Sequence, residues 1–112
     1  MTLAEQLHVA MDEEHLYKNP SLTLMDLTER LNTNRTTLSG FINTTYGFSF
    51  KTFLSIKRIE CAKQYMLKNP MATLEEVAEY SGFYDSVSLC HKFKDVTGVS
   101  PRAWLVAQTE EK

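Results

Sequence analysis

Residues 82–94 read GFYDSVSLCHKFK and are followed at once by DVTGVSP at residues 95–101. Asp85 is a residue type that caps helix N-termini, and Gly98 is the type that most often follows a helix C-terminus. The stretch therefore predicts a short helix between these two residues. Its polar leading edge would consist of Ser86, Ser88 and His91, and its apolar back of Leu89, Phe93 and Val96.

The chain repeats itself at an offset of fifty residues, since residues 17–24 read YKNPSLTL and residues 67–74 read LKNPMATL. After a one-residue insertion the correspondence continues through residues 34–54 and 85–105. General use of leucine and threonine in helices does not account for the shared Lys-Asn-Pro or for the glycine in each copy, so we interpret the two halves as an internal repeat. The matched residues are Asn34, Leu38, Ile42, Gly47, Ser49, Phe53 and Leu54 in the first half and Asp85, Leu89, Phe93, Gly98, Ser100, Trp104 and Leu105 in the second.

Each half begins with the residues that start a short helix. Residues 73–76 (TLEE) form a capping box, in which a threonine N-cap is followed three residues later by a glutamate, and residues 23–26 (TLMD) are its aspartate variant. The helices that follow would run for about eight residues. They would end at Asn32 and Gly82, because asparagine and glycine best tolerate the left-handed backbone after a helix.

A second helix follows in each half after a tight turn. Its N-cap would be Asn34 or Asp85, and it would end at Gly47 or Gly98. The next helix would then begin after a serine N-cap, Ser49 or Ser100, and Pro101 suits the first helical position of the last helix. This order of elements predicts a helix-turn-helix in each half.

Two further helices complete the expected fold: one over about residues 2–17 and a long one over about residues 49–68. In the long helix an apolar face recurs at steps of three and four residues, while Lys51, Lys57, Arg58 and Lys63 lie on other faces. No alternating apolar pattern is long enough for a strand. The sequence predicts an all-α protein of seven helices, in which the long helix joins two helix-turn-helix subdomains.

The charge of the 112-residue chain is unevenly distributed, although its net value is only −2. Residues 1–34 carry two basic groups and six acids, a charge of −4. Residues 35–68 carry six basic groups and one acid (+5), and residues 69–112 carry four and seven (−3). The basic middle third matters more to an anionic partner than the net charge does.

Three stretches together resemble the DNA-binding domain of the AraC/XylS family of bacterial transcription regulators. They are EEVAEYSGFYDSVSLCHKFKDVTGVSPRAWL (residues 75–105), KRIECAKQYMLKNP (57–70) and the weaker DLTERLNTNRTTLSGFINTTYGFSFKTFL (26–54). The resemblance implies one AraC-type DNA-binding domain over residues 1–112, with a first subdomain over about 1–48, a linker helix over about 49–68 and a second subdomain over about 69–112. Each subdomain would place its second helix in a major groove, and the two grooves would lie on successive turns of the duplex, about 34 Å apart.

The resemblance also implies which residues meet double-stranded DNA. The backbone phosphates would be contacted by Lys57 and Arg58. Arginine is common in the family at the positions of Gly40, His91 and Leu105, and this chain lacks all three. The residues expected to face the grooves are Arg35, Thr36, Thr37, Ser39 and Gly40 in the first unit and Ser86, Val87, Ser88, Cys90 and His91 in the second.

Other function classes are weighed against this expectation. No nucleophile motif or phosphate loop indicates an enzyme, and Cys61 and Cys90 supply neither a disulfide framework nor a metal set, so we expect no catalysis, cofactor or metal. The alternative is a helical protein-interaction module with degenerate DNA contacts, in line with the acidic pI of about 5.9. The chain has neither a membrane span nor a signal peptide, so we expect a cytoplasmic protein. RNA polymerase is the expected second partner, and a sensing or dimerising domain is expected elsewhere in a longer protein.

Overall fold

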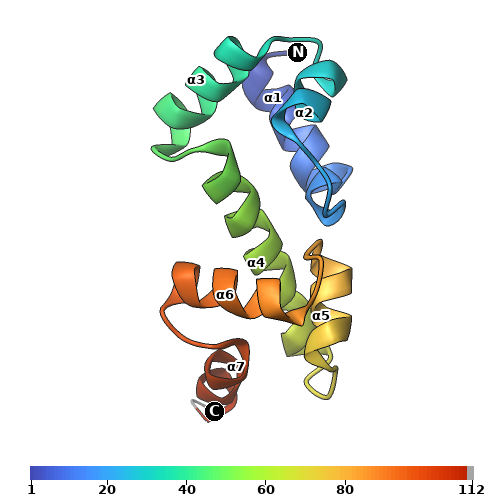
Figure 1. Cartoon of the computed structure of the whole chain (residues 1–112), viewed down its shortest axis with the longest axis vertical. Coiled ribbons are helices and arrows are strands. Elements are labelled where there is room, and N and C mark those ends of the chain that lie inside the picture. Colours follow the sequence, from blue (N-terminus) through green and yellow to red (C-terminus); the bar gives the residue numbers. More distant parts are fainter. Residues whose placement is uncertain (111–112) are drawn as a thin grey trace. The chain divides into compact units, whose positions relative to one another are not determined.

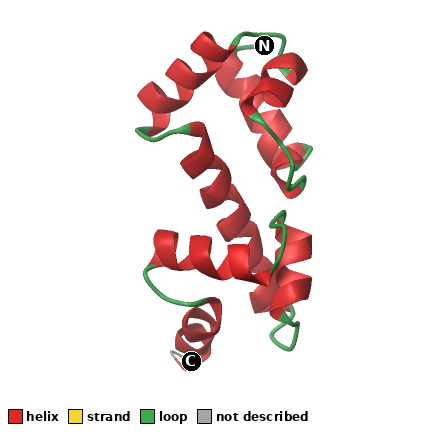
Figure 2. Cartoon of the chain, viewed as in Figure 1, coloured by secondary structure: helices red, strands yellow, loops and turns green. Residues whose placement is uncertain are grey.

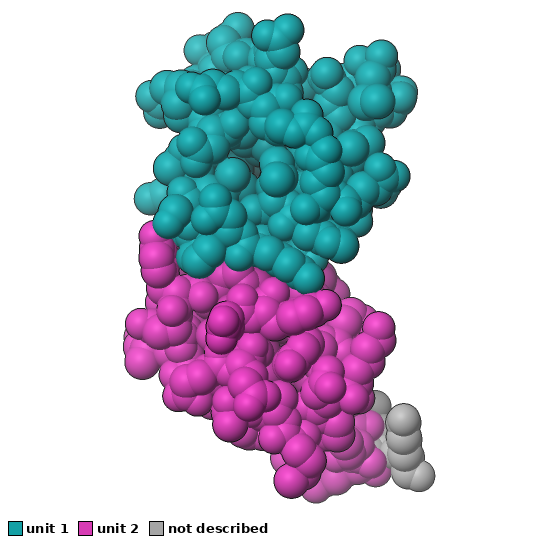
Figure 3. Space-filling model, turned by 90° about the vertical axis from the view of Figure 1, so that its right-hand side faces the viewer, with its two compact units in different colours: residues 1–54 teal, residues 55–112 magenta. Residues whose placement is uncertain are grey.

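The computed structural model describes residues 1–110, and these residues contain seven α-helices and no strand (Figure 2). The expected all-α fold is confirmed. The chain divides into two compact units, residues 1–54 and residues 55–112 (Figure 3). None of the helices within the described range is both long enough and apolar enough to cross a membrane.

The first unit is built from α1 (Leu3–His8), α2 (Leu24–Arg30) and α3 (Arg35–Tyr46) (Figure 1). Two short segments lie between α1 and α2: a π-helical turn over Val9–Glu13 and a 3₁₀ turn over Leu16–Lys18. Helices α2 and α3 pack against each other. The largest fully buried side chains of this unit belong to Leu7, Met11, Leu27, Leu38 and Ile42.

The expectation of one continuous helix over residues 2–17 was wrong. His15 adopts a left-handed backbone with φ of 55°, which ends the helical path before the 3₁₀ turn. Glu14, the residue before this turn, forms an ion pair with Arg30 of α2 at the surface.

The first helix-turn-helix has the caps that the sequence predicts. The Thr23 side chain accepts a hydrogen bond from the Asp26 N–H at 3.1 Å, and the Asp26 carboxylate accepts one from the Thr23 N–H at 3.0 Å. Both halves of the capping box are therefore formed. Asn32 takes the left-handed conformation in the turn, with φ of 54°.

Helix α4 (Phe50–Lys68) begins in the first unit and continues into the second (Figure 1). The expected long helix over about residues 49–68 is confirmed. The Ser49 hydroxyl accepts the Thr52 N–H at 3.4 Å, as an N-cap does. Phe53, Ile59, Ala62 and Met66 recur along its buried face.

The second unit contains α5 (Leu74–Ser81), α6 (Ser86–Thr97) and α7 (Pro101–Glu110) around the inner face of α4. Thr73 caps α5 by accepting the Glu76 N–H at 3.2 Å. Within residues 1–110, the reciprocal hydrogen bond of a capping box, from the Thr73 N–H to the Glu76 carboxylate, is not formed. The core consists of Ile59, Ala62, Met66, Val77, Ala78, Phe83, Leu89, Phe93 and Leu105.

Two small residues of α5 are fully buried in this unit. Ala78 and Ser81 are 1% and 0% exposed, and α5 packs directly against α6. The Ser81 hydroxyl donates to the Val77 carbonyl oxygen at 2.7 Å, so its burial leaves no polar group unsatisfied. Gly82 follows with φ of 97°, the left-handed residue that the turn requires.

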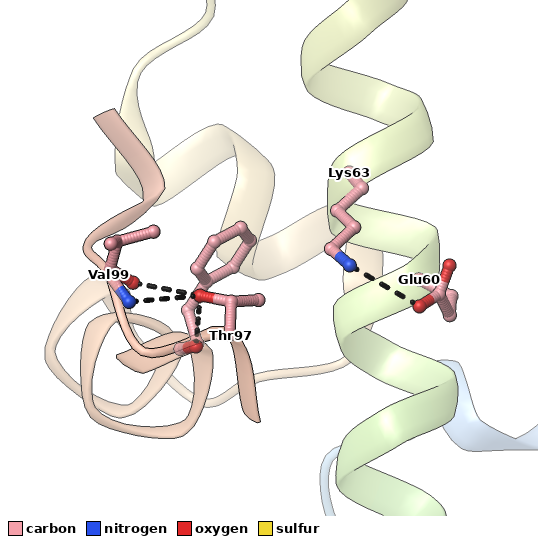
Figure 4. A network of polar contacts seen from close by, with 5 residues as sticks. Glu60, Lys63, Thr97 and Val99 are labelled. Carbon is pink, nitrogen blue, oxygen red and sulfur yellow. Dashed lines mark hydrogen bonds and ion pairs between the residues drawn. The ribbon is translucent and has the colours of Figure 1, made fainter. Parts of the chain in front are cut away.

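The C-terminal end of α6 is closed by polar contacts (Figure 4). The Thr97 hydroxyl donates to the Phe93 carbonyl oxygen at 2.8 Å and accepts the Val99 N–H at 3.2 Å. On the neighbouring face of α4, Lys63 pairs with Glu60 at 3.5 Å. The Lys63 ammonium also lies 5.7 Å from the ring centre of Trp104, a cation–π contact.

The corresponding end of α3 is held by aromatic rings. Tyr46 occupies the repeat position of Thr97, and its ring centre lies 4.9 Å from that of Phe53 and 6.2 Å from that of Phe48. Phe41 meets the same tyrosine edge-on at 6.4 Å. The two copies of the repeat therefore end their second helix at a left-handed glycine, Gly47 or Gly98, with different side-chain chemistry.

One expectation for α6 needs correction. Leu89 and Phe93 are fully buried, whereas Val96 is 38% exposed. Val96 lies seven residues after Leu89 and so on the same side of the helix, but it is in the last turn of α6 and is not covered there. The apolar back of α6 thus consists of Leu89 and Phe93.

We expect Leu89→Ala to lower the free energy of unfolding by about 2–5 kcal/mol, because it removes a fully buried side chain and leaves a cavity. Urea denaturation followed by circular dichroism measures the change. Val96→Ala is the control, and its effect should stay within about 0.5 kcal/mol. Equal losses for the two variants would contradict the assignment of the buried stripe.

Candidate nucleic-acid interface

The leading edge of α3 faces solvent. Leu38 and Ile42 are both 0% exposed and fix this helix by its opposite face. Asn34 caps the helix by accepting the Thr37 N–H at 2.8 Å. As a result the first helical turn is presented outward, with Arg35, Thr36, Thr37 and Gly40 exposed and Ser39 half-buried.

An open depression lies beside this edge. It is lined by Leu24 at the start of α2 and by Arg35, Thr36 and Ser39 of α3. Among residues 1–110, the exposed Arg35 side chain has no hydrogen-bond or ion-pair partner, so its donors are available to a ligand. Its guanidinium is the only cationic group in the first turn of α3.

Gly40 leaves space on the same surface. A Cβ atom built at this position would meet no atom within 4 Å. The glycine is therefore not needed for packing within the protein, and its helical backbone does not require positive φ. Because glycine has no side chain, the backbone of α3 is exposed at this point of the candidate interface.

The leading edge of α6 faces solvent for the same reason. Leu89 and Phe93 are both 0% exposed and hold the helix from behind. Val87 is 62% exposed and His91 is also exposed, whereas Ser86, Ser88 and Cys90 are half-buried. The structure thus brings the residues predicted for each unit to one helix edge of that unit.

Asp85 caps α6 by accepting the Ser88 N–H at 2.8 Å. Hydrogen bonds from the Ser88 backbone and side chain hold the pKa of the Asp85 carboxyl below its ordinary value of 3.8. The N-terminus of α6 therefore carries a carboxylate where that of α3 carries the neutral Asn34. The same positions differ in charge between the two copies.

One residue beside the α6 edge, Glu75, was not predicted from the sequence. It lies in the first turn of α5, and its carboxylate accepts a hydrogen bond from the Ser86 hydroxyl at 3.3 Å. In the repeat register Glu75 corresponds to Met25, so the available signal was a charge present in only one copy. That signal is weak, because an acid in the first turn of a helix is common for its favourable interaction with the helix dipole.

Lys57 and Arg58, the residues expected to contact phosphates, are half-buried on α4. Burial lowers the pKa of the Arg58 guanidinium, and the nearby Tyr84 opposes that shift. An arginine remains charged under any physiological condition. Arg58 therefore supplies a positive charge close to the turn that leads into α6.

No group of three metal-ligating side chains gathers anywhere within residues 1–110. Cys61 and Cys90 are both free thiols. The exposed side chains of the two helix edges are hydroxyls, a guanidinium, an imidazole and methyl groups, which can form hydrogen bonds and apolar contacts with base edges.

A family model described as a helix-turn-helix domain matches residues 27–106, well over half of the chain. The chain belongs to this AraC-type helix-turn-helix family. The expected resemblance is thereby confirmed. The matched residues include parts of both units and the whole of α4.

Several AraC-type relatives are similar over most of the chain. The Msm operon regulatory protein of Streptococcus mutans is 30% identical over 87 residues, which cover 78% of this chain and 31% of that protein. The C-terminal domain of the response regulator yesN from Fusobacterium nucleatum is 30% identical, with a TM-score of 0.76 over 93% of this chain and 99% of that one. The DNA-binding domain of AdpA, solved with a target DNA, is 27% identical with a TM-score of 0.80 over 98% and 95%.

The chain spans about a third of the length of the Streptococcus mutans relative. It matches nearly the whole of the two isolated domains. The comparisons therefore describe a domain, and the remaining parts of the longer regulator have no counterpart in these residues.

The Asp85 cap gives a prediction with a pH window. Because the folded pKa lies below 3.8, the cap contributes its full stabilisation above that pH and loses it as the pH falls further, through the folded pKa. We expect Asp85→Ala to lower the melting temperature at pH 7, and the difference from the wild type to shrink well below pH 3.8. Asp85→Asn, which reproduces the cap of Asn34, should retain the cap at both pH values; a constant deficit for the alanine variant would contradict the assignment.

Proposed function

We propose that this AraC-type domain binds double-stranded DNA in a sequence-specific manner and acts in transcription regulation. One observation carries the proposal: each unit presents the polar edge of the second helix of a helix-turn-helix, fixed from behind by two fully buried residues. This is the arrangement in which the motif places a helix in a major groove. The similar AdpA domain, solved with its target DNA, supports it.

We assign the whole chain, residues 1–112, to one DNA-binding domain. Its subdomains are residues 1–48 and 69–112, and residues 49–68 are the linker helix. In the proposal α3 and α6 enter major grooves on successive turns of the duplex. Recognition of both half-sites then depends on their spacing, about 34 Å along the helix axis.

The side chains of the two edges have complementary roles in this proposal. Thr36, Thr37 and Ser39 supply hydroxyls that can donate or accept, and their neighbour Gly40 lets the α3 backbone approach the DNA. In α6, Ser86 and Ser88 supply hydroxyls, while the exposed methyls of Val87 suit the methyl group of thymine. Cys90 and His91 follow one turn further along. Lys57 and Arg58 contact the phosphates, which position the protein without reading sequence.

The proposal places the chain in the bacterial cytoplasm, where DNA is accessible. A regulator that acts at promoters also needs a second partner, and we propose RNA polymerase. The sensing or dimerising function would belong to residues outside this domain, since the Streptococcus mutans relative is about three times as long as the matched region.

The salt dependence of DNA affinity tests the proposed function. Each phosphate contact should lower the slope of log K against log salt by about 0.9, because neutralised phosphates release counterions. With several contacts from α4 and the two helix edges, we expect a slope of several units, measured by fluorescence anisotropy on a random duplex. No binding at low salt, or a flat response, would favour a protein-interaction module with degenerate DNA contacts.

Arg35 gives a sharper test of sequence reading. If its guanidinium forms two hydrogen bonds with one guanine, Arg35→Ala should weaken the binding free energy for the preferred site by about 1–3 kcal/mol. The preference at one base pair should also be relaxed. Arg35→Lys is the matched control, because lysine keeps the positive charge but cannot form the bidentate hydrogen bonds of a guanidinium. A uniform loss on all sequences, restored by lysine, would make Arg35 a phosphate anchor.

A further inference from the structure

The contact between Glu75 and Ser86 fixes which groups the start of α6 can offer. The Ser86 hydroxyl lies 3.3 Å from the Glu75 carboxylate. An ionised carboxylate has no hydrogen to donate, so the hydroxyl must be the donor. Once its hydrogen is committed to Glu75, Ser86 presents only oxygen lone pairs to a ligand. Both members of the pair are then hydrogen-bond acceptors toward the surface.

No residue in the first turn of α6 is itself cationic, and the positive charge near the preceding turn comes from Arg58 of α4, beside Tyr84. Asp85 adds a second carboxylate at the N-cap, and the next residues are the apolar Val87 and the hydroxyl of Ser88. The basic residues of α6 occur later, with Lys94 in the last turn. An acceptor placed directly against Glu75 and Ser86 would meet lone pairs and negative charge.

The first unit has the opposite polarity at the same repeat positions. There Met25 replaces Glu75, and Arg35 replaces Ser86. Arginine carries donors only, and a thioether carries no charge. The leading edge of α3 is thus a donor and that of α6 an acceptor, although both are built on the same backbone motif.

Bases differ in the groups that they show in the major groove. Guanine offers two acceptors, which suit Arg35, whereas cytosine offers only the N4 amino donor. Adenine also has an amino group, but its neighbouring N7 acceptor would face the carboxylate. An acceptor pair therefore favours cytosine over the other three bases.

We propose that Glu75 is a specificity-determining residue, which together with Ser86 accepts the N4 amino group of a cytosine in the half-site of the second unit. This inference rests on the proposed function, and it adds which base is recognised at one position of the DNA site. Glu75 acts both by attraction of the amino group and by exclusion of guanine and thymine, whose acceptors would be left against a desolvated carboxylate. The two half-sites would then differ in base preference despite the repeat in the protein.

Selection of bound sequences from a random duplex library tests this with the full chain. The wild type should select a cytosine at one position of one half-site by roughly tenfold or more. Glu75→Met, which copies the first unit, should abolish that preference and raise affinity for random duplex. Glu75→Gln should relax it, because an amide also donates. Ser86→Ala should weaken it.

The control is Glu79→Gln, which removes the same charge one turn further along α5 and should leave the cytosine preference intact. Circular dichroism melts confirm that each variant is folded. If the wild type binds no duplex, the proposed function itself fails. If it binds DNA and Glu75→Met keeps the same preference at every position, only the inference about Glu75 is overturned.

Discussion

The buried pair at positions i and i+4 of each second helix is the contact on which the rest of the candidate interface depends. Leu38 and Ile42 in α3, and Leu89 and Phe93 in α6, are all 0% exposed. Two side chains one helical turn apart fix both the axis of a helix and its rotation about that axis. The face of each helix opposite its buried pair is therefore the one exposed to solvent. Without this pair, the polar residues of α3 and α6 would have no defined direction.

Local features were predictable from the sequence because they depend on few neighbouring residues. The caps at Asn34 and Asp85 and the left-handed Asn32 are set by residue type and spacing, and the structure confirms them. Two expectations failed. The helical path at the N-terminus ends at the left-handed His15, and Val96 lies outside a buried stripe that only packing defines.

The candidate site was partly predictable for the same reason. Positions within one helix could be placed on an edge by periodicity, whereas Glu75 reaches Ser86 from a different helix, across the turn. Only the angle between α5 and α6 brings these side chains together. The DNA contacts of the individual residues remain predictions, since they depend on a partner whose groups the sequence does not contain.

The repeat shows how one backbone can be kept while its side chains diverge. At the end of α3 the helix is held by the rings around Tyr46, and at the end of α6 by the hydroxyl of Thr97. Stabilisation by packing and by hydrogen bonds thus supports the same left-handed glycine in each copy. Because either kind of contact can hold the end of the helix, the exposed edges of α3 and α6 can change independently of each other.

Gly40 has a consequence for how such a domain acquires a new preference. A side chain there would meet no protein atom within 4 Å, and replacing glycine inside a helix gains about 1 kcal/mol of stability on average. Most mutations that alter a binding surface lower the stability of the fold or leave it unchanged, but at this position a side chain raises it. A single-nucleotide change from glycine to arginine would add a guanidinium to the α3 edge and strengthen the helix at once. Substitutions at Gly40 can therefore change the preference of the domain for bases in its DNA site without first requiring compensating substitutions elsewhere in the protein.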